Sequence, residues 1–179
     1  MLAGPSMAIF EVRSRHNIPL RHLSKGRTFD DEAMDALREH TDFGKRGCYV
    51  FGISYPTGSL PIYVGKTEEQ SFASRAFSND KLLRIQNFMN SQLRDYKLVI
   101  YLISQTESRG APNIRDIDVI ESWLIYHARQ RNAELVNKRK VANSVYLGPT
   151  LQIVYLHNNF PRGNAPSVVR DFKQMMGIA

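Results

Sequence analysis

The sequence predicts an α+β fold, and three observations carry this prediction. Two short apolar segments, 47–51 and 63–67, flank a loop that holds Pro56, Gly58 and Pro61, a pattern typical of a β-hairpin. A third apolar segment, 97–104, has the sequence KLVIYLIS and predicts another strand. Other segments have apolar residues at helical spacing, and the longest of these segments runs from 114 to 132. Strands and helices in one short chain favour a small sheet flanked by helices.

Side-chain alternation predicts which residues of the hairpin share a face. Antiparallel pairing around the loop places Tyr49 opposite Gly65 and Phe51 opposite Tyr63, so that both tyrosines lie on one face. Cys48 then points to the other face, toward a core. A glycine inside a strand often marks a place where a ligand or backbone must come close, so Gly65 is expected to be the floor of a pocket. The alternative is a hairpin whose tyrosines only pack against their neighbours.

Length and cysteine content limit the classes of protein. A chain of 179 residues with 42% hydrophobic content is long enough for one well-packed core. No segment approaches the roughly 20 apolar residues of a membrane span, so we expect a soluble cytoplasmic protein without a membrane partner. The single cysteine, Cys48, excludes an internal disulfide and a cysteine-rich zinc cluster.

The charge of the chain favours a nucleic-acid partner. Lysine and arginine number 24 against 17 acidic residues, which gives a net charge of +7 and a pI near 9.7. Basic residues gather in the first 27 residues, just before the first hairpin strand, and again over 129–140. The alternative is a basic surface that only confers solubility.

Local signals predict the remaining elements in chain order. The first 28 or so residues resemble an irregular basic arm, followed by a short helix with acids in its first turn. After the hairpin, the spacing of Thr67 and Gln70 predicts a capping box and a helix through Ala76. The further expected elements are a helix over 81–93, the strand over 97–104, a loop over 108–113, the helix over 114–132, extended segments over 145–147 and 151–157, and a terminal helix over 166–176.

One acidic residue lies among the apolar positions of the longest predicted helix. Turning about 100° per residue places Glu121 within the stripe formed by Ile117, Leu124 and Ala128. A buried carboxylate requires a metal ion, a basic partner or a proton, because desolvation penalises its charge. Arg75, on the helix that follows the hairpin, is the candidate partner, either in a functional site or in a structural ion pair.

These elements together resemble the GIY-YIG nuclease superfamily. The resemblance rests on Gly47-Cys48-Tyr49, then Tyr63-Val64-Gly65, then Arg75 on the next helix, Glu121 in the setting Ile120-Glu121-x-x-Leu124-Ile125, and Asn137 after Leu135-Val136. It covers about 47–140 and implies a core around a three-stranded antiparallel sheet. It leaves 1–46 as a basic N-terminal arm with a short helix and 141–179 as a C-terminal extension of strands and a helix. Restriction-type members carry such additions for target recognition or dimer contacts, so a restriction or mobile-element setting and a homodimer are expectations.

The resemblance also implies a reaction and a role for each residue of the site. The reaction is the hydrolysis of DNA phosphodiester bonds with Mg²⁺ (or Mn²⁺). Tyr49 would deprotonate or orient the attacking water, Glu121 would hold the metal, and Arg75 would stabilise the phosphoryl charge, while Tyr63 would line the site. A phenol with a pKa of about 10 is a poor base at neutral pH, so this role for Tyr49 requires a nearby cation.

Further residues are expected to contact the nucleic acid, and some depart from the family pattern. The expected nucleic-acid contacts are Lys66, Asn79, Arg129, Asn137, Lys138 and Arg139. Strand parity turns Lys66 to the face opposite Tyr49, so its role stays open. Many members of the superfamily have a histidine or tyrosine one turn after the arginine, where this chain has Asn79, which cannot take a proton. A P-loop is excluded, because Leu60 stands where that motif needs a glycine before Gly65-Lys66-Thr67.

The function expected from the sequence is therefore a metal-dependent endonuclease that acts on DNA. One alternative is a nucleic-acid-binding protein that keeps the fold with little or no catalytic activity, in which Arg75 and Glu121 form an ion pair. Another is an RNA-cleaving variant, because the electrostatic arguments apply equally to both polymers.

Overall fold

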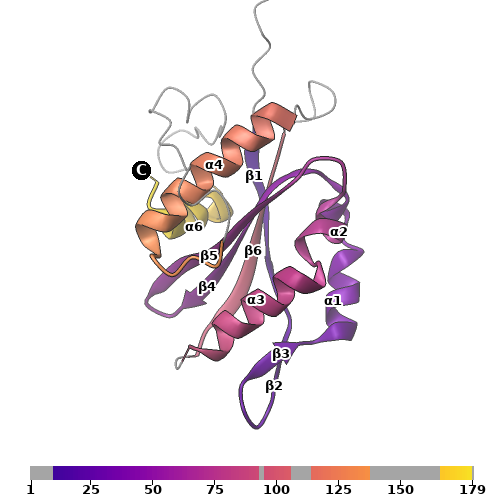
Figure 1. The fold of residues 1–179 in the computed structure, drawn as a ribbon, viewed down its shortest axis with the longest axis vertical. Coiled ribbons are helices and arrows are strands. Elements are labelled where there is room, and N and C mark those ends of the chain that lie inside the picture. Colours follow the sequence, from indigo (N-terminus) through magenta and orange to yellow (C-terminus); the bar gives the residue numbers. More distant parts are fainter. Residues whose placement is uncertain (1–9, 93–94, 106–113, 138–165, 179) are drawn as a thin grey trace, which may run out of the picture.

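The computed structural model describes residues 10–92, 95–105, 114–137 and 166–178 (Figure 1). Its strands are β1 (Phe10–Asn17), β2 (Leu20–His22), β3 (Arg27–Phe29), β4 (Gly47–Tyr55), β5 (Gly58–Thr67) and β6 (Lys97–Gln105). Its helices are α1 (Asp31–Arg38), the short 3-10 helix η1 (Thr41–Gly44), α2 (Phe72–Ala76), α3 (Asn79–Asn90), α4 (Ile114–Arg131) and α6 (Ser167–Met176). The predicted loop over 108–113, the extended segments over 145–147 and 151–157, and Lys138 and Arg139 lie outside the described residues.

The main sheet has four strands in the order β1-β6-β4-β5, with every neighbouring pair antiparallel. The prediction of a three-stranded sheet is therefore wrong. The additional strand, β1, comes from the segment that was expected to be an irregular arm, and a separate two-stranded ribbon joins β2 to β3. Strand β1 was missed because Arg13 and Arg15 interrupt its apolar residues, a composition common in edge strands. A register shift between Val12 and Ser14 further obscures its alternation.

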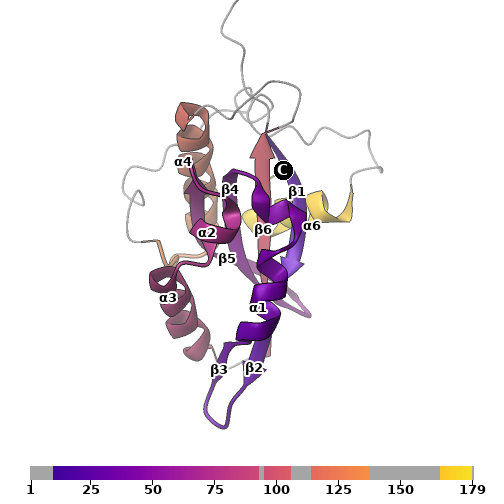
Figure 2. The ribbon, with the colours of Figure 1, turned by 90° about the vertical axis from the view of Figure 1, so that its right-hand side faces the viewer.

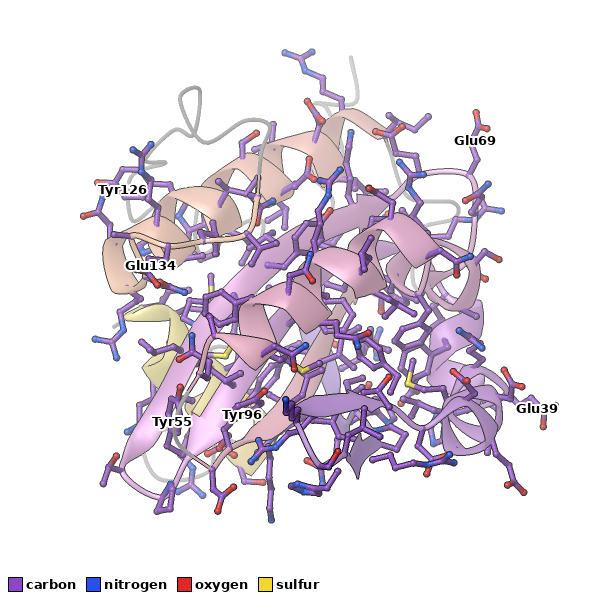
Figure 3. The ribbon with its side chains drawn as sticks, turned by 60° about the horizontal axis from the view of Figure 1, so that its bottom comes forward. Glu39, Tyr55, Glu69, Tyr96, Tyr126 and Glu134 are labelled. Carbon is purple, nitrogen blue, oxygen red and sulfur yellow. The ribbon has the colours of Figure 1, made fainter. Side chains whose placement is uncertain are left out.

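The hairpin of β4 and β5 has the predicted register near the tyrosines. Tyr49 pairs with Gly65 and Phe51 pairs with Tyr63, and the register shifts only beyond Phe51, toward the turn. At the turn end, Tyr55 packs edge-on against Tyr96 with ring centroids 6.1 Å apart (Figure 3). This contact holds the turn end of the hairpin against the residue that precedes β6.

Helices cover both faces of the main sheet. On one face, α4 and α6 pack against Cys48, Val50 and Val64. On the other face, α1, α2 and α3 pack against Tyr49, Phe51 and neighbouring strand residues. Figure 1 shows the two groups of helices on either side of the strands, and Figure 2 shows the β2–β3 ribbon below α1. The predicted burial of Cys48 on the face opposite Tyr49 is confirmed. None of the helices in the described ranges is long and apolar enough to cross a bilayer.

The helix that follows the hairpin begins later than predicted. Strand β5 continues through Thr67, and α2 begins at Phe72 after Ser71. The hydroxyl of Thr67 accepts a hydrogen bond of 3.0 Å from the backbone N–H of Gly47, so it ties the two strands together and caps no helix. The predicted capping box is therefore wrong, because the same hydroxyl can serve a strand end or a helix start.

Candidate functional site

The centre of the site is formed by Gly65 of the edge strand β5 and Tyr49 of the neighbouring strand β4. A Cβ atom at Gly65 would lie 2.4 Å from both Cζ and Oη of Tyr49, so only a glycine leaves room for this ring. The ring of Tyr49 is fully buried and stacks on that of Tyr63 with centroids 6.2 Å apart. The missing side chain therefore lets a phenol from the inner strand β4 reach across to the edge of the sheet.

Helix α4 supplies one wall of the site. Glu121 is only 8% exposed and lies in the apolar stripe with Ile117 and Leu124, as the sequence predicts. Lys66 extends to the side of the sheet on which α4 lies, where its ammonium donates to the carboxylates of Glu68 and Asp118. The positive charge of Lys66 on this wall is thus matched by the protein itself.

Helices α2 and α3 supply the facing wall. Arg75 stands in the last turn of α2 and is exposed, and within the described residues its guanidinium has neither a hydrogen bond nor an ion pair. On α3, Arg84 pairs with Asp80 at 2.7 Å, while Lys81 donates to the backbone oxygen of Arg75 and, at 3.1 Å, to Oγ of Ser78. This wall therefore carries cationic groups that no described carboxylate neutralises.

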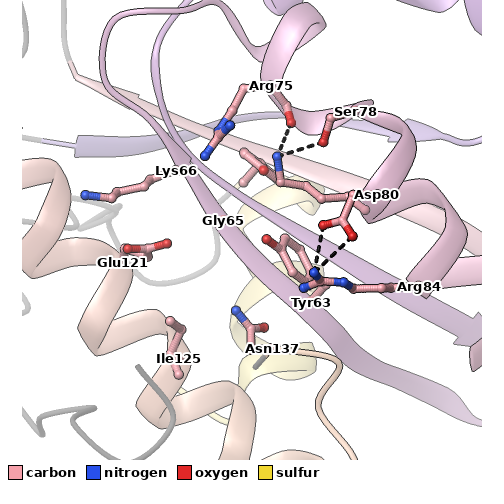
Figure 4. Close-up of a pocket in the computed structure, with 12 residues that line it drawn as sticks. Tyr63, Gly65, Lys66, Arg75, Ser78, Asp80, Arg84, Glu121, Ile125 and Asn137 are labelled. Atoms are coloured by element: carbon pink, nitrogen blue, oxygen red, sulfur yellow. Dashed lines mark hydrogen bonds and ion pairs between the residues drawn. The ribbon is translucent and has the colours of Figure 1, made fainter. Parts of the chain in front are cut away.

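The two walls enclose a cavity of about 740 Å³ at the edge of the sheet (Figure 4). All four residues to which the sequence analysis gave catalytic roles line it: Tyr49, Tyr63, Arg75 and Glu121. Figure 4 shows Arg75 and Glu121 on opposite sides of β5, and no ion pair between described residues joins them. The alternative of a structural Arg75–Glu121 pair therefore has no counterpart in this geometry.

The residues expected to contact nucleic acid are distributed differently. Lys66 and Asn137 line the cavity, whereas Asn79 and Arg129 are exposed and do not. The side-chain amide of Asn137 is committed to β5, because it donates to the carbonyl of Val64 at 2.7 Å and accepts from its N–H at 2.9 Å. Val136 adds a backbone bond to Ile62, so the segment after α4 closes the outer edge of the strand.

The protein holds both phenols of the cavity in their neutral form at ordinary pH. Burial raises the pKa of Tyr49 far above its usual value, and the neighbouring Tyr63 adds to the increase while Arg75 opposes it. Burial and the charge of Glu121 also raise the pKa of Tyr63. In this geometry, Tyr49 is a hydrogen-bonding group that can orient a water molecule.

Glu121 is the residue of the cavity that fits a hard divalent cation. Mg²⁺ prefers oxygen ligands, keeps several waters, and is commonly held by one or two carboxylates together with substrate phosphates. The carboxylate of Glu121 lines the cavity from α4, and Asp80, which binds Arg84, lines it from α3. A second group of donors, His16, His40 and Asp42, has ligand atoms within 4.8 Å of one another. It lies on β1 and at the start of η1, where His40 is the N-cap, and it does not line this cavity.

Sequence reasoning missed the contribution of α3 to the site. Lys81, Ile85 and Met89 are the buried residues of this helix and recur every fourth position, so Lys81 occupies an apolar stripe as Glu121 does on α4. The same test that singled out Glu121 would have found Lys81.

No protein-family model matches the chain, and neither a curated protein nor a solved structure does. The resemblance to GIY-YIG nucleases therefore rests on the sequence motifs and stays a prediction.

Proposed function

We propose that this chain is a metal-dependent endonuclease that hydrolyses DNA phosphodiester bonds. The observation that carries the proposal is the position of Arg75. Its guanidinium has no partner within the described residues and faces a cavity that Tyr49 and the buried carboxylate of Glu121 also line. An arginine without a carboxylate is ready for bidentate contact with a phosphate.

The residues meet the main demands of phosphodiester hydrolysis. Arg75 would stabilise the negative charge that builds on the phosphoryl oxygens, and the hydroxyls of Tyr49 and Tyr63 would orient the attacking water. Glu121 would hold Mg²⁺ or Mn²⁺, which when bound supplies Lewis-acid stabilisation and makes a bound water more acidic. The net charge of +7 favours approach of the polyanion. We propose the cytoplasm as its location and a restriction or mobile-element setting.

The neutral state of the phenols supports a second candidate. Because burial raises the pKa of Tyr49, the protein without its metal and substrate has a poor base there. A nucleic-acid-binding protein with little or no activity is therefore the competing proposal.

Plasmid cleavage separates the two candidates. Wild-type protein, Tyr49→Phe and Glu121→Ala are incubated with plasmid DNA in Mg²⁺ and in EDTA, with a single-stranded RNA offered in parallel. The proposal expects DNA nicking by wild type in Mg²⁺ alone and a loss of at least about 100-fold in each variant. Cleavage that both substitutions leave intact would refute the site. DNA binding without cleavage under any condition would favour the competing proposal, and preferential cutting of RNA would change the substrate.

A further inference from the structure

Lys81 is a buried lysine that the roles above do not use. Its side chain is 8% exposed and occupies the apolar stripe of α3 with Ile85 and Met89, yet it also lines the cavity. Lysines usually bury only their methylene stem and keep the ammonium in water. Here the ammonium lies at the wall of a cavity beside another cation, Arg75.

The hydrogen bonds of Lys81 leave its charge unbalanced. The ammonium has three donors, of which one goes to the backbone oxygen of Arg75 and one to Ser78, at 3.1 Å. No carboxylate in the described part of the chain forms an ion pair with it, and the neighbouring Asp80 binds Arg84 at 2.7 Å. These two bonds connect the end of α2 to the start of α3, but they do not explain why a second cation faces the cavity beside Arg75.

We propose that Lys81 is a second phosphate-binding residue of the cavity, which holds a backbone phosphate together with Arg75. This inference rests on the proposed function, since it concerns the same cavity and the same phosphodiester substrate. A phosphate would supply the acceptor for the remaining N–H and the negative charge that the two cations lack.

Phosphate binding at Lys81 should be coupled to the uptake of a proton. Burial first, and the charge of Arg75 second, lower the pKa of Lys81 to about 8. The other charged or titratable groups around the cavity are Asp80 and Arg84 on α3, Lys66 and Tyr63 on β5, Tyr49 on β4 and Glu121 on α4. A bound phosphate favours the ammonium and raises its pKa again, so above about pH 8 binding draws one proton from solution.

Binding of a labelled DNA duplex in EDTA, measured across about pH 7 to 10, tests the inference without cleavage. Wild-type affinity is expected to fall by up to about tenfold per pH unit above pH 8. The reason is that binding requires protonated Lys81, and the protonated fraction falls about tenfold with each pH unit above its pKa. Lys81→Arg keeps its charge throughout and should bind with little dependence on pH. Lys81→Met should bind at least about tenfold more weakly at pH 7 and converge with wild type at the alkaline end. Lys97→Met removes an exposed lysine outside the cavity and serves as the matched control.

Calorimetry in buffers of different ionisation enthalpy gives an independent readout. Proton uptake at about pH 8.5 should be seen with wild type and Lys97→Met and be absent with Lys81→Arg. Equal uptake in wild type and Lys81→Arg, or identical pH profiles for wild type and Lys81→Met, would overturn the inference. A merely structural lysine would change thermal stability in these variants and leave the proton count unchanged. DNA binding that is coupled to proton uptake, without any cleavage in Mg²⁺, would reject the proposed nuclease and leave this role of Lys81 intact.

Discussion

The two walls of the cavity differ in whether every cation on them has a carboxylate partner among the described residues. On the α4 side, Lys66 is bound by two carboxylates, those of Glu68 and Asp118. On the α2–α3 side, Arg75 and Lys81 have no carboxylate partner among the described residues. A cation that the protein already neutralises contributes little to an anionic ligand, whereas one without a counter-charge gains from binding it. Under the proposed function, this difference favours a phosphate on the α2–α3 wall and a metal at Glu121 on the facing wall.

Removing Arg75, which has no carboxylate partner among the described residues, should have the largest effect. Arg75→Ala is expected to lower the single-turnover rate of DNA cleavage by about 10²–10³-fold, because it deletes a donor aimed at the developing phosphoryl charge. Arg75→Lys should recover only part of the loss, since lysine cannot make the bidentate contact. A rate within about threefold of wild type for Arg75→Ala would show that the phosphate does not lie on this wall.

Adding a side chain at Gly65, which lies between the two walls, should disturb the packing of the whole site. In Gly65→Ala the new methyl group would lie 2.4 Å from the ring of Tyr49, so the ring or strand β5 must shift. We expect a loss of about 1–3 kcal/mol in the free energy of unfolding, measured by urea denaturation, together with reduced cleavage. Gly44→Ala is the matched control, because a Cβ there meets nothing within 4 Å. Equal stability of the two variants would contradict the close contact.

A substitution of Asn137 tests whether this polar residue of the cavity stabilises the fold or binds the nucleic acid. Asn137→Ala removes two hydrogen bonds to Val64 and should destabilise the protein by about 1–2 kcal/mol. Its affinity for duplex DNA, measured well below the unfolding temperature, should stay unchanged. Weaker binding at unchanged stability would instead restore its predicted role as a nucleic-acid contact.

The cation of the α4 wall should give the smallest effect. Lys66→Met is expected to change the free energy of unfolding by only about 0–1 kcal/mol, because its ammonium is partly exposed to solvent. Its DNA affinity should fall less than that of Lys81→Met at neutral pH. The reverse order of the two affinities would remove the distinction between the walls.

Short-range patterns in the sequence were enough to predict the centre of the site. Strand parity predicts that Tyr49 faces Gly65, and helical rotation predicts that Glu121 is buried, because both depend only on neighbouring residues. The edge strand β1 was missed since its arginines hide the alternation, and its pairing with β6 is a contact between distant parts of the chain.

Other features depend on tertiary contacts that no local pattern encodes. The amide of Asn137 closes β5 from a segment that follows α4, so the sequence could indicate its importance without revealing its bonding. Thr67 illustrates the converse, because a local pattern typical of helix capping was overridden by a hydrogen bond from the backbone N–H of Gly47. Lys81 could have been found, since its place in an apolar stripe is visible in the sequence.

A crystal structure of the protein with a short DNA duplex and Mg²⁺ tests the central claim most directly. The two-wall account predicts a backbone phosphate in contact with Arg75 and Lys81, and a cation bound to Glu121 on the other side of Gly65. A duplex bound to another face of the protein, with Arg75 and Glu121 in contact with neither phosphate nor metal, would contradict it.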